Sequence, residues 1–332
     1  MHAMVHHRFG RASEVLRLEQ VQTPEPGEGE VLVRVEASSA NPYDWHTIRG
    51  EPWVMRLGSS GLREPKQPIP GGDFAGTVAA VGSGDVGGLV EGDEVYGFNH
   101  GAFAEYLVAP HHRMAKRPAG LTWEETASLP LAGATALQGL NEVGGLRAEQ
   151  KALIIGASGG IGSLAVQMAK MWGAEVTGVS STSNTDMVAA LGADRVIDYK
   201  REDYSRGEDR YDVVFQLGGT ASPRALRRVL TASGTLVQCA GDGSRALGPV
   251  PNVLMAKLMD RVVAQRLLLV MTREDTATLD TIREMVEAGA LRPVIDHAVD
   301  FRDAGFAVDE VHNGSPRGKI VISGYDREAP YD

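Results

Sequence analysis

The stretch ALIIGASGGIGSLAVQMAK, residues 152–170, decides the fold of this chain. Residues 152–155 form a short apolar run of the strand type, and a glycine cluster follows at 156–162. Apolar residues then recur at helical spacing, at Ile161, Leu164, Ala165, Met168 and Trp172. The order is therefore strand, tight turn and helix, which is the order that a dinucleotide site requires.

The glycine cluster fits the fingerprint G-x-G-x-x-G, with Ala157, Gly159 and Gly162 in its three glycine positions. Gly159 would let backbone N–H groups approach a pyrophosphate, and Gly162 would let the helix lie close to the strand. The phosphate charge would face the positive end of the helix. The residues expected to bind the cofactor here are Ala157, Ser158, Gly159, Gly160, Ile161 and Gly162.

Two other interpretations use the same residues. Residues 156–160 also match G-x-S-x-G, the nucleophile elbow of hydrolases, with Ser158 as nucleophile and His297 or His312 downstream as base. An isoleucine and one further glycine, Ile161 and Gly162, follow this match, which favours a phosphate-binding turn over an elbow. The remaining alternative is a glycine-rich turn that binds no ligand.

Composition limits the classes of protein to which the chain can belong. A length of 332 residues favours two domains, and 43% hydrophobic with 23% charged residues is ordinary for a globular protein. A formal net charge of −10 argues against nucleic acid as the partner. No stretch approaches the roughly 18 apolar residues of a membrane span, and the N-terminus lacks the apolar segment of a signal peptide. The single cysteine, Cys239, forms no internal disulfide. Together these features predict a cytoplasmic protein without membrane contact.

The front of the chain is rich in strand patterns. Residues 30–36, EVLVRVE, alternate in the manner of a half-buried strand, and short strands are expected at 76–81, 94–98 and 103–108. Glycine-rich turns such as GSGDVGG separate them. The first 120 residues therefore predict an all-β, barrel-like unit.

From Thr122 the pattern changes. Thr122 and Glu125 form a capping box at the start of a helix. Beyond the glycine turn, strands are expected at 175–179, 195–198, 211–217, 234–239 and 266–271, with helices at 185–191, 223–230 and 277–288 and a last strand at 319–323. Strands that alternate with helices predict a parallel sheet covered on both faces, and thus an α/β fold with a doubly wound sheet.

Several motifs, spread in order over nearly the whole chain, resemble the medium-chain dehydrogenase/reductase superfamily, and more narrowly its zinc-free, quinone oxidoreductase-like branch. They are NPYDWHTIRG, PGGDFAGTVAAVG, GDEVYGF, GAFAEYLVAP, LPLAGATALQGL, GASGGIGSLAVQMAK, LGADRVIDY and RGKIVI. The resemblance implies a GroES-like catalytic domain at 1–122, completed by 273–332, and a Rossmann domain at 123–272. It also implies NADPH-dependent reduction of quinones or activated alkenes, by a homodimer.

Zinc-dependent members of that superfamily differ at three positions. They place a cysteine where this chain has Asn41, a histidine at Gly72 and a glutamate at Asp73. Zinc sites need about four ligands, of which three come from the protein in an open site, and one carboxylate is insufficient. We therefore expect no metal.

The resemblance extends to the hydride-transfer site and the cofactor. It implies that Asn41, Tyr43, Asp44 and His46 face the nicotinamide. Tyr43 and His46 can donate a proton, the alternative being that either simply packs against the cofactor, and Asp44 more often positions the loop. Thr135 would approach the nicotinamide, although a helix threonine also bonds back to its own turn. The remaining expected cofactor contacts are Ser180, Ser181, Tyr199, Leu217, Gly218, Arg317 and Lys319.

The cofactor expected from the residues is NADP. An NAD enzyme carries Asp or Glu about 20 residues after the start of the fingerprint, to bind the ribose hydroxyls. This chain has Thr177-Gly178-Val179-Ser180-Ser181-Thr182 there, so a 2′-phosphate is not repelled and hydroxyls can donate to it. The alternative is that these serines are ordinary loop residues.

Three functions stay open at this point, besides the less favoured serine hydrolase with Ser158 as nucleophile. The first is an NADPH-dependent, metal-free oxidoreductase acting on small-molecule quinones or enones. The second is a carbonyl reductase or alcohol dehydrogenase on the same scaffold. The third is a nucleotide-binding protein without turnover.

Overall fold

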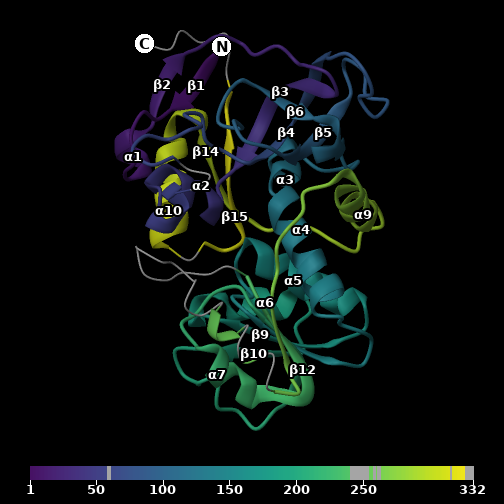
Figure 1. Cartoon of the computed structure of the whole chain (residues 1–332). Coiled ribbons are helices and arrows are strands. Elements are labelled where there is room, and N and C mark those ends of the chain that lie inside the picture. The colour runs from purple at the N-terminus through teal and green to yellow at the C-terminus, as the bar shows by residue number, and fades with distance from the viewer. Residues whose placement is uncertain (58–60, 240–253, 257–258, 260–262, 315, 326–332) are drawn as a thin grey trace. The chain divides into compact units, whose positions relative to one another are not determined.

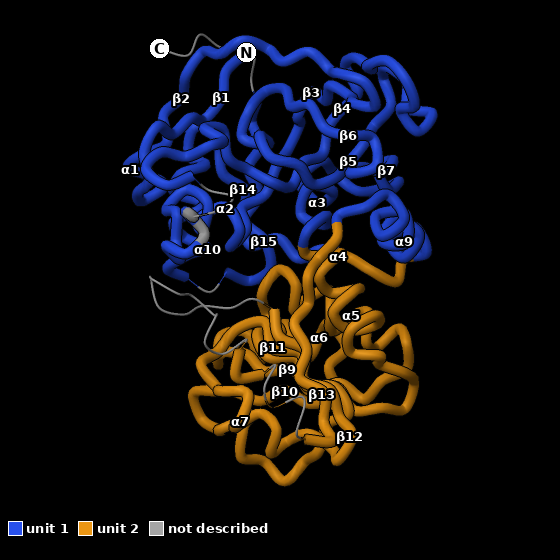
Figure 2. The backbone as a smooth tube through the Cα atoms, in the orientation of Figure 1, with its two compact units in different colours: residues 1–131, 274–288, 293–332 blue, residues 132–273, 289–292 orange. Residues whose placement is uncertain are grey.

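The structure is a computed structural model that describes the chain apart from residues 58–60, 240–253, 257–258, 260–262, 315 and 326–332 (Figure 1). The chain forms two compact units, shown in blue and orange in Figure 2. Unit 1 consists of residues 1–131, 274–288 and 293–332, and unit 2 of residues 132–273 and 289–292. The domain limits inferred from the sequence, at 122/123 and 272/273, stay a proposal.

Unit 1 is built on a mixed seven-stranded sheet. Its strands lie in the order β14 (Ile295–Asp300), β15 (Lys319–Ser323), β3 (Glu30–Ser39), β4 (Asp73–Val81), β5 (Glu94–Phe98) and β7 (Met114–Lys116), and β6 (Tyr106–Pro110) pairs with β3. β14 and β15 are parallel, and the other pairs are antiparallel. A separate two-stranded sheet pairs β1 (His2–Val5) with β2 (Arg17–Gln20). The predicted β-rich first domain is confirmed.

Strand β3 brings distant parts of unit 1 together. Its alternating Val31, Val33 and Val35 are completely buried, as the period-two pattern predicts. At its other end, Ser39 lies opposite Asp73 of β4 on one side and opposite Val321 of β15 on the other. The end of β3, the start of β4 and the first half of β15 therefore meet at one place in the sheet.

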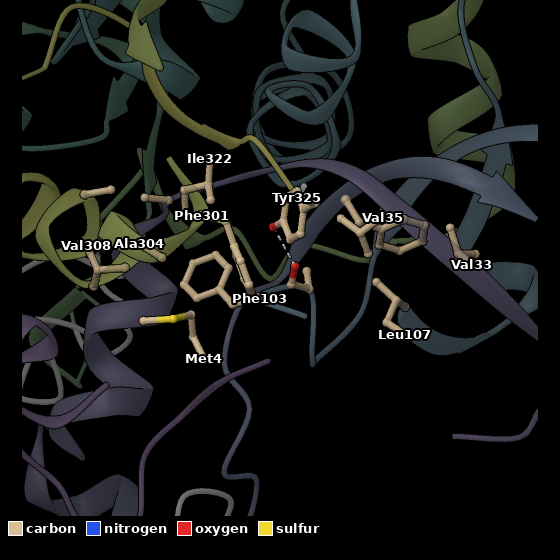
Figure 3. Close-up of a cluster of buried hydrophobic side chains, with 14 of the residues drawn as sticks. Met4, Val33, Val35, Phe103, Leu107, Phe301, Ala304, Val308, Ile322 and Tyr325 are labelled. Atoms are coloured by element: carbon tan, nitrogen blue, oxygen red, sulfur yellow. Dashed lines mark hydrogen bonds between the residues drawn. The ribbon is translucent and has the colours of Figure 1, made fainter. Parts of the chain in front are cut away.

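The core of unit 1 joins both ends of the chain. Figure 3 shows Met4 and Phe103 packed with Phe301 and Ile322 in one buried cluster. The rings of Phe301 and Tyr325 are stacked with centroids 4.4 Å apart, and the Tyr325 hydroxyl donates to the Ala102 carbonyl at 3.0 Å. Apolar burial of this kind contributes about 25 cal/mol per Å², so it fixes the C-terminal strands against the N-terminal ones.

The prediction of an all-β first unit omits helix α2 (Pro42–Arg49). Proline occupies the first turn, where its missing N–H costs nothing, and the Asp44 carboxylate accepts from the Asn41 backbone N–H at 2.7 Å. Gly50 ends the helix in the left-handed conformation, at φ 60°. The other helices of unit 1 are α1 (Ala12–Val15), α3 (Trp123–Ala127), α9 (Thr276–Glu287) and α10 (Ala304–Asn313).

Unit 2 is a six-stranded, all-parallel sheet. Its order is β10 (Arg195–Asp198), β9 (Glu175–Ser180), β8 (Lys151–Ile155), β11 (Tyr211–Gln216), β12 (Leu230–Gln238) and β13 (Arg266–Leu269). In chain order this is 3-2-1-4-5-6, the doubly wound arrangement in which the strand order reverses between β8 and β11. The predicted α/β fold with a parallel sheet is confirmed.

Of the helices of unit 2 that the structure describes in full, α5 (Gly160–Met171) is long, and α6 (Thr185–Ala190) and α7 (Pro223–Leu226) are short. Helix α4 (Pro130–Leu137) contains the boundary between the units. The helix predicted at 223–230 ends early, because a 3₁₀ turn at Arg227–Val229 leads directly into β12. No helix among the described residues is both long and apolar enough to cross a membrane.

Candidate functional site

The glycine turn of unit 2 follows β8 and leads into α5. Gly156 has φ +88°, a backbone conformation that favours glycine, and Gly159 is the N-cap of α5 without a side-chain cap. A Cβ on Gly162 would lie 2.1 Å from the Gly156 carbonyl oxygen, so this position requires glycine for the helix to lie close to the turn. A Cβ on Gly159 would meet a single atom, the same oxygen at 3.6 Å, so the surface above Gly159 is open.

Leu217 and Gly218 lie beside this turn. A Cβ on Gly156 would be 3.5 Å from Leu217 Cβ and 3.6 Å from the Gly218 backbone nitrogen. A Cβ on Gly218 would meet no atom within 4 Å. These residues follow β11, so the structure brings them together with the turn at the point where the strand order reverses. That point is where ligands bind in open α/β sheets.

Ser158 has a partner that does not suit a nucleophile elbow. Its hydroxyl accepts a hydrogen bond from the Asn184 side-chain amide at 3.2 Å, and the serine is 9% exposed. An elbow serine needs an imidazole as base. His297, one of the two histidines considered for that role, pairs with Glu310 at 3.4 Å. The contacts of Ser158 therefore favour the phosphate-binding interpretation of this turn.

The end of β9 carries the serines expected to approach the ribose. Ser180 is 2% and Ser181 8% exposed, and the Tyr199 backbone N–H donates to the Ser180 carbonyl at 3.1 Å. Sequence reasoning missed Asp198, which lies opposite Ser180 on β10. Its carboxylate accepts from the Thr182 hydroxyl at 2.7 Å and lies 3.4 Å from Arg201 Nε. The Thr182 bond, and to a lesser extent nearby cations, lower the pKa of Asp198.

Thr135 lies buried in α4. Its hydroxyl is 2.9 Å from the Thr272 hydroxyl, within unit 2. The hydroxyl–hydroxyl contact therefore joins α4 to the segment after β13. A role for Thr135 at the nicotinamide stays a prediction.

A buried polar cluster in unit 1 forms where β3, β4 and β15 meet. We call it the Lys319 cluster, and its members, each at most 6% exposed, are Ser39, Asn41, Asp44, Asp73 and Lys319. Burying a carboxylate or an ammonium costs several kcal/mol per ion unless partners replace the lost water. The contacts inside the cluster show how that cost is offset.

Asp73 is the centre of the Lys319 cluster. Its Oδ2 accepts from the Ser39 hydroxyl at 2.6 Å, from the Asn41 amide at 2.8 Å and from Lys319 Nζ at 3.1 Å. Its Oδ1 accepts from the Leu131 backbone N–H at 2.9 Å. Both carboxylate oxygens are therefore bonded, and the ammonium of Lys319 compensates the negative charge.

Asn41 is held at both ends of its amide. Its Oδ1 accepts from Lys319 Nζ at 2.5 Å, while its Nδ2 donates to Asp73 and, at 3.3 Å, to the Ser39 carbonyl. The amide is therefore committed to the cluster. Sequence reasoning had placed Lys319 with the cofactor; its ammonium lies on Asn41 and Asp73, and a cofactor contact stays a prediction.

Asp44 is the second carboxylate of the cluster and has no exposed surface. Its Oδ2 accepts from the Asn41 backbone N–H, whereas Oδ1 has no hydrogen-bond partner among the described residues. Burial raises the pKa of Asp44 to about 7; the negative charge of Asp73 adds to the shift, and the Asn41 bonds and the Lys319 charge oppose it. This carboxyl therefore titrates near neutrality.

Tyr43 contacts a histidine that sequence reasoning missed, His100. The Tyr43 hydroxyl lies 2.6 Å from Nε2 and 3.1 Å from Nδ1 of His100, and its ring packs edge-on against Phe98, with centroids 5.4 Å apart. His100 follows β5 in the motif GFNH, so a polar residue just past a strand end was the available signal.

His46 is engaged at the end of α2. Its Nδ1 is 2.7 Å from the Glu51 carbonyl oxygen, and its ring lies against Trp45, with centroids 3.6 Å apart. Arg317, the remaining predicted contact, donates its backbone N–H to Asp296 at 3.0 Å. For both residues, roles in catalysis or cofactor binding stay predictions.

Two family models match the chain. One, described as an alcohol dehydrogenase GroES-like domain, matches residues 27–119, and the other, described as a zinc-binding dehydrogenase, matches residues 191–322. Ser39, Asn41, Asp44 and Asp73 fall in the first match and Lys319 in the second. The Lys319 cluster is therefore made from both matched segments.

Curated relatives cover nearly the whole chain. The chloroplastic quinone-oxidoreductase QR1 of Triphysaria versicolor is 31% identical over 340 residues, covering 97% of this chain and 98% of the relative. The chain belongs to the quinone oxidoreductase-like branch of the medium-chain dehydrogenase/reductase superfamily. This confirms the resemblance inferred from the motifs, and it makes the chain an NAD(P)H-dependent oxidoreductase.

Two further comparisons agree with this assignment. The 2-methylene-furan-3-one reductase of Solanum lycopersicum is 33% identical over 325 residues, covering 93% of this chain and 76% of the relative. The solved structure of the quinone oxidoreductase from Coxiella burnetii is 28% identical, with a TM-score of 0.84, covering 97% of this chain and 99% of that one. The quinone oxidoreductase-like chain thus shares its fold with a solved member of the branch.

The name of the second family model raises the question of zinc, and the absence of zinc stays a prediction. At the positions where the resemblance implies zinc ligands, the chain has an amide and a glycine, Asn41 and Gly72, beside Asp73. The Asp73 carboxylate is already bonded to the Lys319 ammonium, which would repel a second cation. Among the described residues, the group of metal-ligating side chains that does converge is Asp296, His297 and Glu310, at the surface.

Proposed function

We propose that this quinone oxidoreductase-like chain reduces quinones or α,β-unsaturated carbonyl compounds with NADPH, and that it does so without zinc. The observation that carries the proposal is the Lys319 cluster, in which a buried ammonium lies on Asp73. By the resemblance, Asp73 is the one carboxylate among the three positions at which zinc-dependent relatives differ. NADPH supplies the hydride. The chain's own residues must then bind the cofactor, orient the substrate and stabilise the charge that forms on the substrate carbonyl.

The glycine turn fits a dinucleotide. The uncapped N-terminus of α5 offers free backbone N–H groups, and the open surface above Gly159 and Gly218 leaves room for a pyrophosphate. Ser180, Ser181 and Tyr199 would take the ribose end. These roles follow from where the residues lie, at the ends of β8, β9, β10 and β11.

NADPH is proposed over NADH because β9 ends in serines. The nearest carboxylate, Asp198, is on the neighbouring strand and is occupied by Thr182 and Arg201. A charge-assisted contact to the 2′-phosphate contributes roughly 1.5–3 kcal/mol, which corresponds to at least about tenfold in affinity. Titrations with both cofactors should therefore give a dissociation constant at least about tenfold lower for NADPH.

The proposed substrates share one electronic requirement. Two relatives carry the names quinone-oxidoreductase and 2-methylene-furan-3-one reductase. In both named substrates a carbon–carbon double bond is conjugated to a carbonyl group. Hydride addition to such a system builds negative charge on the carbonyl oxygen, so a hydrogen-bond donor there acts mainly in the transition state. Of the proposed catalytic residues, Tyr43 carries a hydroxyl that can serve, because the Asn41 amide is committed to Asp73 and Ser39.

Steady-state NADPH oxidation tests the proposal. Purified chain is assayed with benzoquinone, cyclohexenone and benzaldehyde, before and after a strong chelator, and its metal content is measured by elemental analysis. We expect quinone and enone reduction that survives the chelator, with no stoichiometric zinc. Activity lost on chelation and restored by zinc would refute the metal-free assignment, and reduction of benzaldehyde alone would favour the carbonyl reductase alternative.

A further inference from the structure

The hydroxyl of Tyr43 contacts a titratable side chain, the imidazole of His100. The Tyr43 hydroxyl is 2.6 Å from His100 Nε2, which is a short distance for a hydrogen bond to an imidazole. Both residues are only partly buried, and so is the contact between them. The two residues come from α2 and from the turn after β5, 57 positions apart in sequence.

The surroundings keep both groups neutral near pH 7. Burial, followed by the negative charges of Asp44 and Glu274, raises the pKa of the Tyr43 hydroxyl, while Arg113 acts in the opposite direction. Burial and the positive charge of Arg113 lower the pKa of His100. A neutral phenol beside a neutral imidazole can donate a proton, and the imidazole can give one at one nitrogen while it takes one at the other.

The candidate residues Asn41, His46 and Lys319 have other partners, while the charged groups that act on the pair are Arg113, which donates to Asn99 at 3.3 Å, and Glu274. Asn41 and Lys319 bond to each other and to Asp73 inside the buried cluster, and His46 Nδ1 lies on the Glu51 carbonyl. The Lys319 cluster and the Tyr43–His100 pair therefore share no side-chain hydrogen bond among the described residues. They are linked through the chain, because Tyr43 lies between Asn41 and Asp44, whose contacts fix the start of α2.

We propose that Tyr43 and His100 form a proton-delivery pair for enone reduction, an inference that rests on the proposed function. NADPH would supply a hydride to the β-carbon of the enone, which would leave an enolate. The Tyr43 O–H bond breaks and its proton goes to the enolate oxygen, which gives an enol that converts to the ketone in water. His100 gives its Nε2 proton to the tyrosinate oxygen while Nδ1 takes a proton from water and leaves hydroxide, so Tyr43 is restored and His100 ends as its other neutral tautomer.

Quinones are expected to need this pair less. A quinone is already a strong electrophile, and its reduced form holds negative charge well enough to take its protons from solvent. An enone is a weaker electrophile, and loss of one general acid typically reduces the rate by 10²–10⁴-fold, with tenfold as a conservative lower limit. The ratio of enone to quinone turnover therefore separates proton delivery from a general structural role.

The experiment compares Tyr43→Phe, His100→Gln and His100→Ala with the parent chain. Glutamine keeps a hydrogen-bond donor toward Tyr43 but cannot relay a proton, and His112→Gln is the control, because His112 is an exposed histidine of the same unit. We expect Tyr43→Phe and His100→Gln to lower kcat for cyclohexenone by roughly tenfold or more. KM, the affinity for NADPH and benzoquinone turnover should change much less. Added imidazole should restore enone turnover to His100→Ala.

Each alternative result is decisive. Enone turnover at the parent rate in Tyr43→Phe and His100→Gln would overturn the pair while leaving the proposed function intact. Equal losses with quinone and enone, or a His100→Ala variant that imidazole does not rescue, would assign the pair a structural role. A parent chain that oxidises NADPH with neither substrate would overturn the proposed function and the pair with it.

Discussion

The glycine turn of unit 2 and the Lys319 cluster of unit 1 are constructed in opposite ways. The turn is local: seven consecutive residues, Gly156 to Gly162, present backbone N–H groups and leave space where side chains are missing. The cluster is made of side chains from three strands and the start of α2, and its central ion pair joins residues 246 positions apart. A site made of backbone depends on the residues next to it, whereas a site made of side chains depends on the whole sheet.

This difference predicts where a single substitution does most damage. Lys319→Met removes the ammonium and leaves Asp73 as a buried carboxylate without its counterion. Breaking a buried ion pair from one side costs about 3–5 kcal/mol, so the free energy of unfolding should fall by that amount. Denaturant unfolding followed by circular dichroism measures it.

Two matched variants sharpen this first prediction. Lys116→Met removes a lysine that pairs with Asp93 and is itself 61% exposed, so its cost should stay below about 1 kcal/mol. Combining Lys319→Met with Asp73→Asn removes both charges and should recover part of the loss. If Lys319→Met costs no more than Lys116→Met, the cluster does not depend on its charge pair.

The same contrast explains what the sequence could predict. The turn, the parallel sheet and the placement of Leu217 and Gly218 beside Gly156 follow from local patterns and from the rule that parallel strands end at one edge. The position of Lys319 could not be inferred in that way. Its place depends on the pairing of β15 with β3 and of β3 with β4, and no local pattern specifies that pairing.

His100 and helix α2 illustrate two further reasons. His100 was missed because its one signal, a polar residue just past a strand end, does not say which residue it meets, and the fold brings it to Tyr43. Helix α2 did have a signal, since Asn41-Pro42 with Asp44 and then Gly50 carry start and stop residues. The eight-residue segment is dense in polar and aromatic groups, which concealed its helical character.

The Lys319 cluster should also make stability depend on pH, through Asp44. The folded-state pKa of Asp44 is about 7 against an ordinary value of 3.8, so the folded chain binds the proton more tightly than the unfolded chain. Stability from this group is therefore full below pH 3.8 and is lost as the pH rises through about 7. Between about pH 5 and pH 8 the loss should be about 2–3 kcal/mol.

Asp44→Asn isolates that contribution. An asparagine oxygen can still accept from the Asn41 backbone N–H, but it does not titrate. Unfolding free energies measured at several pH values should fall with pH in the parent and less steeply in the variant, by the same 2–3 kcal/mol or so across the range. Parallel profiles for the two proteins would mean that Asp44 does not hold a proton near neutrality in the folded chain.

The glycine turn gives the smallest expected effect on stability and the clearest test of a backbone site. In Gly162→Ala the new Cβ would lie 2.1 Å from the Gly156 carbonyl oxygen and 2.7 Å from Ala157 Cα, so the turn or α5 must shift. Overpacking of this kind typically costs about 1–3 kcal/mol, and it should also displace the N–H groups that would bind NADPH.

In Gly159→Ala the Cβ meets a single atom at 3.6 Å and the backbone, at φ −82°, suits alanine, so the fold should keep its stability. The methyl group would instead occupy the space expected for the pyrophosphate. Gly159→Ala should therefore weaken NADPH binding in a fluorescence titration without lowering the unfolding midpoint, whereas Gly162→Ala should change both. If Gly159→Ala binds NADPH as tightly as the parent, the open surface above the turn is not where the cofactor lies.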